Sequence, residues 1–167
     1  MSDVFDKDMN LEEDTQHGRF LTFTLEDEVY GIEIRYVTEI IGIQPITKVP
    51  EVPPYVKGII NLRGKIIPLV DMRLKFGKEP IEYNDRTCIV VVDINQVDVG
   101  IIVDSVDEVI TIEDEDIAAP PDSRTGFENR YIKGIGKVGD RVQLLLDSDK
   151  LLRVDEMDII EGIADEA

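Results

Sequence analysis

The feature that most constrains the fold of this chain is an internal repeat. Residues 55–76 (YVKGIINLRGKIIPLVDMRLKF) align without a gap with residues 131–152 (YIKGIGKVGDRVQLLLDSDKLL), and six of the 22 aligned positions are identical. Upstream, residues 26–41 align in the same order with residues 95–110. The chain is therefore predicted to hold two copies of one unit, the second with a seven-residue insertion. Similar composition would make two apolar hairpins alike, but it would not reproduce their order and ungapped register.

The length of the chain suggests how the two copies are stabilised. At 167 residues it can hold one ordinary domain or two very small ones. Very small units bury too little apolar surface to be safely independent, so we expect the copies to share a core. The composition is 43% hydrophobic and 32% charged. No apolar run approaches the roughly 18 residues that span a bilayer, and the acidic start lacks the pattern of a signal peptide, which together favour a globular cytoplasmic protein.

The net charge of −18 is concentrated in three places. Residues 1–16 contribute −5, residues 113–116 contribute −4 and residues 155–167 contribute −6. Such acidic segments are typically solvated or disordered, and they repel nucleic acid and anionic lipid. Residues 57–75, named the basic run below, contain five cations and one carboxylate, Asp71. The basic run either faces an acidic protein partner or is a solvated hairpin face. Its cations are Lys57, Arg63, Lys65, Arg73 and Lys75.

Alternating apolar residues and turn signals predict a series of β-hairpins. In the first copy, turns are expected at residues 26–28 and at Arg63-Gly64, where Gly64 supplies the positive φ of a tight turn. In the second copy they are expected at residues 95–96 and 139–140. Short strands with Gly and Pro punctuation favour small antiparallel barrels over a parallel sheet. The predicted fold class is therefore all-β.

Short helices are expected where strands end. Asp71 is predicted to cap a helix over residues 72–76, and Asp147 is predicted to cap a second helix near the C-terminus. Residues 36–41 are compatible with one helical turn or with a continuing strand.

No constellation of residues predicts catalysis. The single histidine, His17, lies in the acidic N-terminal region, and the chain contains neither GxxxxGK[ST] nor GxGxxG. The acidic stretch at residues 113–116 lacks the glycine and the terminal glutamate of a calcium-binding loop. The single cysteine, Cys88, lies in an expected strand and is interpreted as a small buried hydrophobe. We therefore expect no enzymatic activity, no cofactor and no metal.

The run VKGIINLRGKIIPLVDMRLKFG at residues 56–77 resembles the signature of the CheW-type chemotaxis coupling proteins, as does FTLEDEVYGIEIRYVTEI at residues 23–40. The blocks at residues 97–110 and 131–152 fit the same family, so the resemblance covers roughly residues 19–153. It implies two intertwined SH3-like five-stranded antiparallel barrels without enzymatic activity. It also implies an adaptor, a scaffold that joins the chemotaxis histidine kinase, through its regulatory domain, to the cytoplasmic tips of methyl-accepting chemoreceptors.

This resemblance suggests a domain organisation. A CheW-like domain is expected at residues 19–153, between an acidic flexible tail at residues 1–18 and an acidic C-terminal segment at residues 154–167. Its barrels are expected at approximately residues 30–85 and 86–147, with exchange of terminal strands. The protein is expected in the cytoplasm, recruited to membrane receptor arrays by protein partners without inserting into the membrane.

The resemblance also implies roles for individual residues. Arg63, in Asn61-Leu62-Arg63-Gly64, matches the receptor-contacting arginine of the family, and a guanidinium can grip a carboxylate bidentately. The receptor groove is expected between the two barrels. The other expected receptor-binding residues are Val37, Glu39, Ile40, Gly100 and Val106, while Lys57 and Gly58 are expected to bind the kinase or the receptor.

Simpler roles remain open for several of these residues. Val37 is also compatible with core packing and Arg63 with a solvent-facing turn, while Gly58 and Gly100 either admit a partner's backbone or shape their own strands. The alternative function is a regulatory-type SH3-like binding module for another acidic signalling partner. A kinase is disfavoured because no nucleotide-binding or dimerisation domain is recognised. A proline-peptide binder is disfavoured because the chain has no Trp and only 6% aromatic residues.

Overall fold

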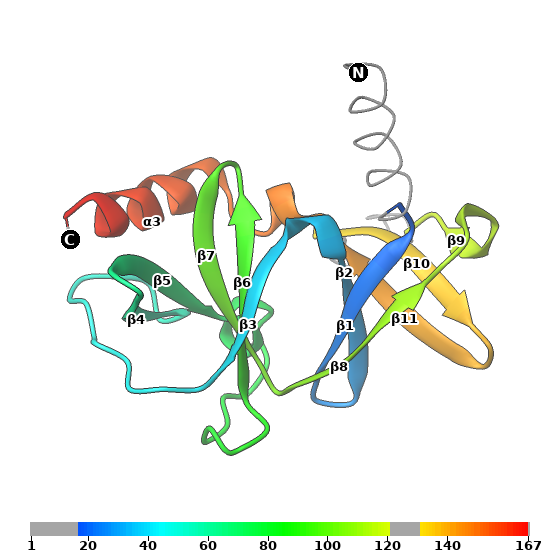
Figure 1. The fold of residues 1–167 in the computed structure, drawn as a ribbon, viewed down its shortest axis with the longest axis horizontal. Coiled ribbons are helices and arrows are strands. Elements are labelled where there is room, and N and C mark those ends of the chain that lie inside the picture. The colour runs from blue at the N-terminus through cyan, green and yellow to red at the C-terminus, as the bar shows by residue number, and fades with distance from the viewer. Residues whose placement is uncertain (1–16, 121–130, 167) are drawn as a thin grey trace, which may run out of the picture.

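Two small β-barrels lie side by side in the protein (Figure 1). The computed structural model describes residues 17–120 and 131–166. One barrel has six strands in the order β8-β1-β2-β11-β10-β9, and the other has five in the order β3-β6-β7-β5-β4. They are named the six-stranded and the five-stranded barrel, and they confirm the predicted all-β class. The strands are β1 (Arg19–Leu25), β2 (Glu28–Glu33), β3 (Val37–Gly42), β4 (Val56–Leu62), β5 (Lys65–Asp71), β6 (Cys88–Ile94), β7 (Val97–Val103), β8 (Ser105–Thr111), β9 (Ile117–Ala118), β10 (Ile132–Val138) and β11 (Arg141–Leu146).

Short helical segments connect the strands, and one longer helix follows them. The sixth strand β9 pairs with β10 at Ile135, whereas at the equivalent Ile59 of the first copy Thr47 forms only an isolated bridge, so only one barrel exceeds the expected five strands. The α-helices are α2 (Met72–Lys75) and α3 (Val154–Glu166), and the described 3-10 helices are η1 (Ile34–Tyr36), η2 (Asp114–Asp116) and η4 (Ser148–Lys150).

The predicted hairpins are present, and their turns have the twist that the strands require. The turn between β4 and β5 has φ of 53° at Arg63 and 84° at Gly64. The turn between β6 and β7 likewise has φ of 51° at Asn95 and 70° at Gln96. Two consecutive positive φ angles are typical of the type I′ turn, whose twist matches that of the flanking strands. Arg63 thus adopts a backbone conformation that residues other than glycine seldom adopt.

The chain passes between the barrels twice, so the barrels are intertwined. It leaves the six-stranded barrel between β2 and β3 and returns to it between β7 and β8. The five-stranded barrel therefore combines β3, β4 and β5 of the first copy with β6 and β7. β6 and β7, which follow residue 85, hydrogen-bond with β3 and β5, which precede it.

Each barrel contains one parallel pairing besides the antiparallel pairings that the sequence predicted. In the five-stranded barrel β5 runs parallel to β7, with Leu69 opposite Gly100. In the six-stranded barrel β11 runs parallel to β2, with Leu145 opposite Gly31. The repeat alignment matches these two leucines with each other and these two glycines with each other. The repeat in the sequence therefore corresponds to equivalent leucine–glycine pairings in the two barrels.

A shared core joins the barrels, as expected for units too small to be stable alone. Phe23 of β1 lies with Val90 and Val92 of β6 in one cluster that draws on both barrels. The intervening residues Ile89 and Val91 belong instead to the interior of the five-stranded barrel. Because β6 is buried on both faces, its sequence is a continuous apolar run and does not alternate.

The two predicted N-caps are present. The Asp71 carboxylate accepts hydrogen bonds from the backbone amides of Arg73 and Leu74 at the start of α2. The Asp147 carboxylate accepts one from the amide of Asp149, but the helix that it caps is a single 3-10 turn, η4. The longer helix α3 begins separately at Val154.

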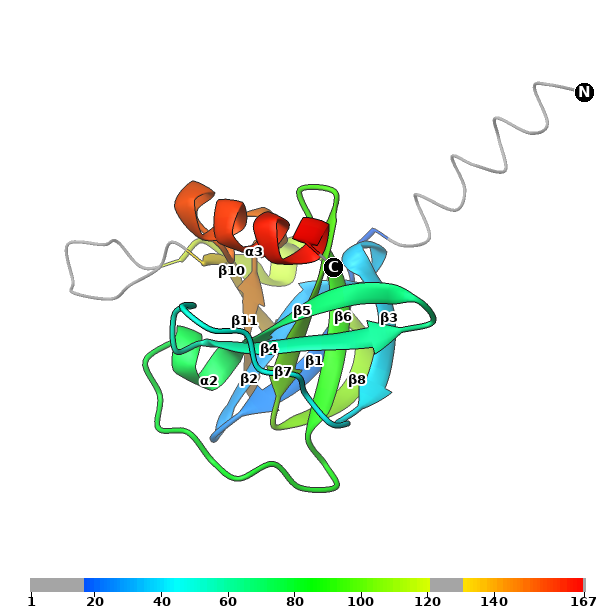
Figure 2. The same ribbon diagram turned by 90° about the vertical axis from the view of Figure 1, so that its left-hand side faces the viewer.

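The acidic C-terminal segment forms helix α3 as far as residue 166, so the expected helix near the C-terminus is present and the segment is not simply a solvated acidic run. Met157 and Ile160 are buried in the shared core, and the helix lies beside β5 (Figure 2). Glu156 is buried too, and it forms an ion pair with Lys75 of α2. The acidic face of α3 is therefore solvated while its apolar stripe packs against the barrels.

Candidate functional site

The tip of the β4–β5 hairpin presents Arg63 to solvent. The Asn61 side chain accepts a hydrogen bond from the amide of Gly64 at 2.8 Å, which stabilises the tight turn. The Arg63 side chain is 71% exposed, so it is available to a partner. The turn that the sequence predicted is therefore also the element that projects the expected receptor-contacting arginine.

Arg63 forms an ion pair with Glu39 of β3, so two segments 24 positions apart contribute to one surface. The Glu39 side chain is 25% exposed, and its neighbour Ile40 is 43% exposed. An exposed pair of this kind contributes only about 0–1 kcal/mol to stability. Its main consequence is to hold the guanidinium at the tip of the hairpin against β3, whereas the Ile40 side chain points to the other face of that strand.

Val37 and Val106 occupy equivalent positions in the two copies, at or near the starts of β3 and β8. Both are half-buried and pack against the shared core. Each lies beside a register shift, between Val37 and Glu39 on β3 and between Thr22 and Phe23 on β1 opposite β8. Their position combines core packing with partial exposure, so neither of the two roles considered for Val37 is excluded.

Gly58 and Gly100 are buried, so their own surroundings account for the need for glycine. A Cβ at Gly58 would lie 2.1 Å from the carbonyl oxygen of Thr47, and φ at Gly58 is +145°. A Cβ at Gly100 would lie 2.5 Å from Leu69 Cδ2 and 2.8 Å from Ile89 Cγ2. Of the two roles left open by the sequence, shaping the strand is the one that this geometry supports.

The basic run is largely neutralised by carboxylates from elsewhere in the chain. Lys57 has a different environment, with its Nζ 6.0 Å from the centroid of the Tyr83 ring. The local positive field expected from the sequence is therefore weaker than the residue count indicates. The ion pairs are Arg63 with Glu39, Lys65 with Asp98, Arg73 with Asp104, and Lys75 with Glu156.

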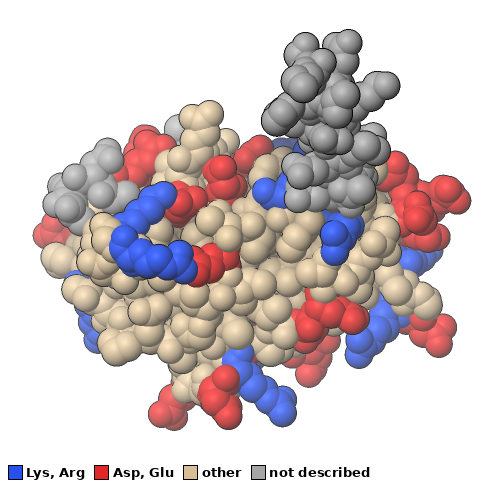
Figure 3. Space-filling model, viewed as in Figure 1, with Lys and Arg blue, Asp and Glu red and all other residues tan. Residues whose placement is uncertain are grey.

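Among the exposed apolar residues that the sequence reasoning did not select, Val109 is equivalent in the repeat to a candidate residue. Val109 of β8 is among the exposed large hydrophobic residues, and the repeat aligns it with Ile40 of β3. The face on which β3 and β8 lie is largely uncharged across its middle (Figure 3). The repeat itself was the signal that would have found Val109, because it pairs Val109 with a residue already chosen.

Two hollows on the described residues are lined by none of the candidate residues. One of about 220 Å³ is lined by residues that include Glu33, Arg35 and Lys133, and another of about 360 Å³ lies between the β1–β2 turn and β11. Within the described ranges no three His, Cys, Asp or Glu residues are grouped so that they could hold a metal ion. No helix in the described part of the chain has both the length and the apolar character needed to cross a membrane.

The fold defines the class of this protein as an intertwined pair of SH3-like barrels with an exposed hairpin tip. Its sequence matches the family model described as "CheW-like domain" over residues 19–156. The chain therefore belongs to the CheW-like family.

The alignments with individual relatives extend over most of each relative's length. The chain is 37% identical over 151 residues to "Chemotaxis protein CheW" of Klebsiella aerogenes, which covers 90% of this chain and 91% of the relative. It is 37% identical over 137 residues to the protein of the same name from Helicobacter pylori, with 82% of each covered. Among solved structures, the scaffolding protein TtCheW of Thermoanaerobacter tengcongensis matches with a TM-score of 0.77 and 36% identity. That match covers 83% of this chain and 94% of TtCheW.

Proposed function

We propose that this protein is a non-catalytic adaptor that couples the signalling tips of chemoreceptors to the chemotaxis histidine kinase. Membership of the CheW-like family supports this proposal, as do relatives named as chemotaxis proteins and a similar structure titled a scaffolding protein. The adaptor holds receptor and kinase in one geometry, so that a change in the receptor alters kinase activity through binding free energies.

The receptor-binding surface is proposed to comprise the hairpin tip and the adjoining part of β3. The observation that carries this proposal is the Arg63–Glu39 ion pair, because it joins two distant segments at one place. An incoming carboxylate can displace Glu39 from the guanidinium. Ile40 is exposed on the other face of β3, where an apolar side chain of the receptor helix is proposed to cover it. Val37 supports the same strand from its half-buried position.

The remaining candidate residues act by shaping the strands that carry this surface or by contacting the kinase. Gly100 and Val106 are proposed to affect receptor binding through β7 and β8, since Gly100 is buried and Val106 is half-buried. Gly58 and Lys57 lie side by side on β4, where they are proposed to serve the kinase or the receptor.

The proposed location is the cytoplasm, with recruitment to receptor arrays through protein partners and with no cofactor. The net charge of −18 opposes direct binding to nucleic acid or to anionic lipid. The alternative, an SH3-like module for another acidic signalling partner, rested on the basic run. The internal ion pairs of that run weaken the argument for this alternative.

Arg63→Ala is the substitution that tests the receptor surface. Because the ion pair is exposed, its loss should leave the fold intact while it reduces capture by a receptor signalling fragment about 10-fold or more, the effect expected for a lost charge-assisted contact. Arg63→His should have the same direction. A pull-down with purified receptor fragment measures the change, and circular dichroism checks the fold.

Arg141→Ala is the matched control, since Arg141 is an exposed arginine at the tip of the equivalent hairpin in the second copy. It should capture the receptor fragment as well as the unmodified protein does. Equal capture by Arg63→Ala and Arg141→Ala would show that the receptor surface has been assigned to the wrong place.

A further inference from the structure

The two places where the chain crosses between the barrels are equivalent in the repeat but are held differently. One crossing is η1, between β2 and β3, and the other is Asp104, between β7 and β8. The repeat aligns Arg35 of η1 with Asp104. Figure 1 shows the two crossings at opposite edges of the junction between the barrels. Their side chains therefore offer a direct comparison of how each edge is fixed.

At the Asp104 crossing, a buried arginine clamps the carboxylate. Arg73 of α2 donates from Nε to Asp104 Oδ1 at 2.7 Å and from Nη2 to Asp104 Oδ2 at 2.6 Å. Its remaining nitrogen, Nη1, donates to the carbonyl oxygen of Glu79 at 2.9 Å. The side chains of Arg73 and Asp104 are only 10% and 18% exposed. A bidentate pair in this environment is geometrically specific and poorly screened by salt.

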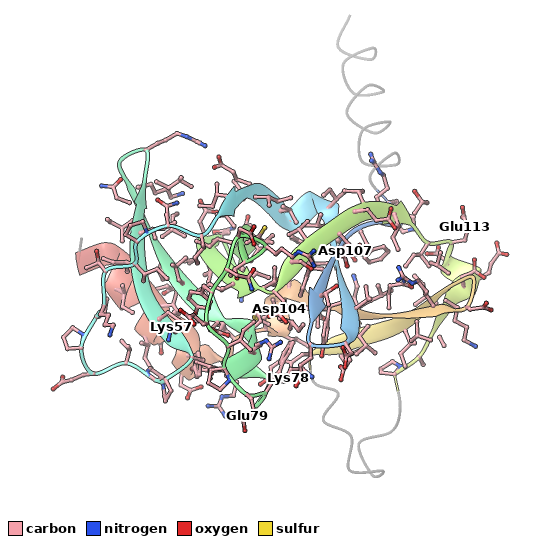
Figure 4. All side chains as sticks on the ribbon, turned by 90° about the horizontal axis from the view of Figure 1, so that it is seen from below. Lys57, Lys78, Glu79, Asp104, Asp107 and Glu113 are labelled. Carbon is pink, nitrogen blue, oxygen red and sulfur yellow. The ribbon has the colours of Figure 1, made fainter. Side chains whose placement is uncertain are left out.

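The same crossing is tied to the β1–β2 turn of the six-stranded barrel. Asp104 Oδ2 accepts a hydrogen bond from the amide of Glu26 at 2.8 Å, and the Asp104 amide donates to the carbonyl oxygen of Thr24 at 3.1 Å. Lys78, which follows α2, reaches Glu26 and Glu28 at 3.1 and 3.2 Å. Figure 4 shows Lys78 and Asp104 near each other beside that hairpin. These contacts link α2 of one barrel to the turn of the other.

A second buried ion pair also starts from α2. Lys75 pairs with Glu156 of α3, and both side chains are almost fully buried. The Lys75 ammonium lies 4.6 Å from the centroid of the Tyr55 ring, which adds a cation–π contact. Helix α3 follows the last strand of the six-stranded barrel, so this pair ties the end of that barrel to α2 of the five-stranded barrel.

The equivalent positions at the other crossing do not form such a clamp. The repeat aligns Arg73 with Asp149 of η4, so the charges at the two sites are reversed, and it aligns Lys75 with Leu151. Arg35 is 58% exposed and pairs with Glu33, only two residues away on β2, and Asp149 is exposed. Within residues 17–120 and 131–166, Arg35 and Asp149 form no ion pair with each other.

We propose that α2 is the fixed pivot between the two barrels and that the η1 crossing is the compliant one. The Arg73–Asp104 clamp and the Lys75–Glu156 pair hold one edge of the junction, while the shared core keeps the barrels in contact. Relative rotation of the barrels then takes place at Arg35, because the ion pairs of Glu33 with Arg35 and with Lys133 of β10 involve no residue of the five-stranded barrel. Arg73 is thus a positioning residue for the geometry of the whole protein.

The compliant crossing leads directly into β3, which carries Val37, Glu39 and Ile40. A partner that binds β3 therefore acts on the crossing that can move, a consequence that rests on the proposed function. The proposal of a pivot does not rest on that function, because the distances and exchange rates that test it are measured on the protein without any partner.

Double electron–electron resonance on the full chain tests the pivot. Spin labels are placed at Thr38→Cys on β3 and Lys137→Cys on β10, two exposed positions on different barrels, in a Cys88→Ala background. Arg73→Ala should clearly broaden the distribution of distances between the labels. The matched control Arg35→Ala, at the position equivalent to Asp104, should leave its width unchanged. A Lys78→Gln variant, which keeps the buried pair, should broaden it to a smaller extent.

Hydrogen exchange of the unmodified protein keeps the proposal falsifiable if Arg73→Ala does not fold. The amides around Asp104 should exchange more slowly than those of the η1 crossing, because opening there breaks the clamp. Equal exchange at the two crossings would contradict the proposal. So would an unchanged distance distribution in folded Arg73→Ala, or equal broadening in Arg35→Ala.

Discussion

Replacing Gly100 with alanine should destabilise the protein through packing strain and not through loss of a partner contact. The added Cβ would approach Leu69 Cδ2 to 2.5 Å and Ile89 Cγ2 to 2.8 Å. Contacts below 3.0 Å are essentially never seen for a real Cβ, so both side chains must move. Leu69 and Ile89 are fully buried in the interior of the five-stranded barrel, which leaves them little room to do so.

Two opposing contributions set the size of the effect. Inserting a methyl group into a well-packed core costs about 1–3 kcal/mol, whereas alanine in a strand gains about 0.5–1 kcal/mol over glycine in conformational entropy. The strain should win at Gly100 because two buried groups are involved. The expected loss in the free energy of unfolding is about 1–2 kcal/mol.

Urea unfolding followed by far-ultraviolet circular dichroism measures this loss, since the chain has no Trp to serve as a fluorescent probe. The midpoint should fall while the slope of free energy against urea stays the same. Gly31→Ala should cost less, because only Leu145 Cδ2, at 2.9 Å, lies within 3.0 Å of its Cβ. Gly42→Ala is the control, since its Cβ would meet nothing within 4 Å.

A second substitution separates strain from recognition. Leu69→Val shortens the side chain that the new Cβ meets, so the Gly100→Ala and Leu69→Val double variant should lose less than the sum of the two single losses. The reasoning would be refuted if Gly100→Ala were as stable as the unmodified protein and still failed to bind the receptor fragment.

Two further predictions concern α2 and α3. Burial disfavours the Glu156 carboxylate, yet hydrogen bonds from Lys75 and Tyr55 outweigh it and lower its pKa from 4.5 to about 2. This stabilisation is present above pH 4.5 and is lost as the pH falls toward 2, so Glu156→Gln should show a weaker dependence of unfolding free energy on pH between these limits. Asp71→Ala removes a buried cap that accepts two amides and the Tyr83 hydroxyl, so urea unfolding at pH 7 should show a loss of about 2 kcal/mol. Equal pH profiles, or an unchanged midpoint for Asp71→Ala, would contradict these assignments.

The local structure could be predicted because its signals lie within a few residues of each other. Gly64 after Arg63 marked the β4–β5 turn, and Asp71 marked the cap of α2. The repeat also predicted a shared core, since neither copy is large enough to be stable alone. These features depend on turn chemistry and on burial, both of which leave direct traces in a sequence.

The partners of each strand could not be predicted in the same way. Nothing local in β5 indicates that it pairs in parallel with β7 of the other copy. Likewise, the carboxylates that neutralise the basic run come from distant parts of the chain, as Asp104 does for Arg73. The sequence predicted an apolar helix near the C-terminus, but not that the turn capped by Asp147 would end as η4 and α3 begin separately.

In the candidate site, too, single residues could be predicted from the sequence but their distant partners could not. The resemblance picked out Arg63 and Glu39 separately, whereas their ion pair depends on β3 and the β4–β5 hairpin belonging to the same barrel. For Gly100, residue type alone left two roles open, and its burial between Leu69 and Ile89 favours the role of shaping the strand.

Co-sedimentation with receptor-containing membranes and the chemotaxis histidine kinase tests the adaptor function most directly. The account predicts that the kinase sediments with the membranes only when this protein is present, and that kinase activity then responds to the receptor. Arg63→Ala should reduce both effects, whereas Arg141→Ala should preserve them. Equal sedimentation and equal kinase activity with and without the protein would contradict the account.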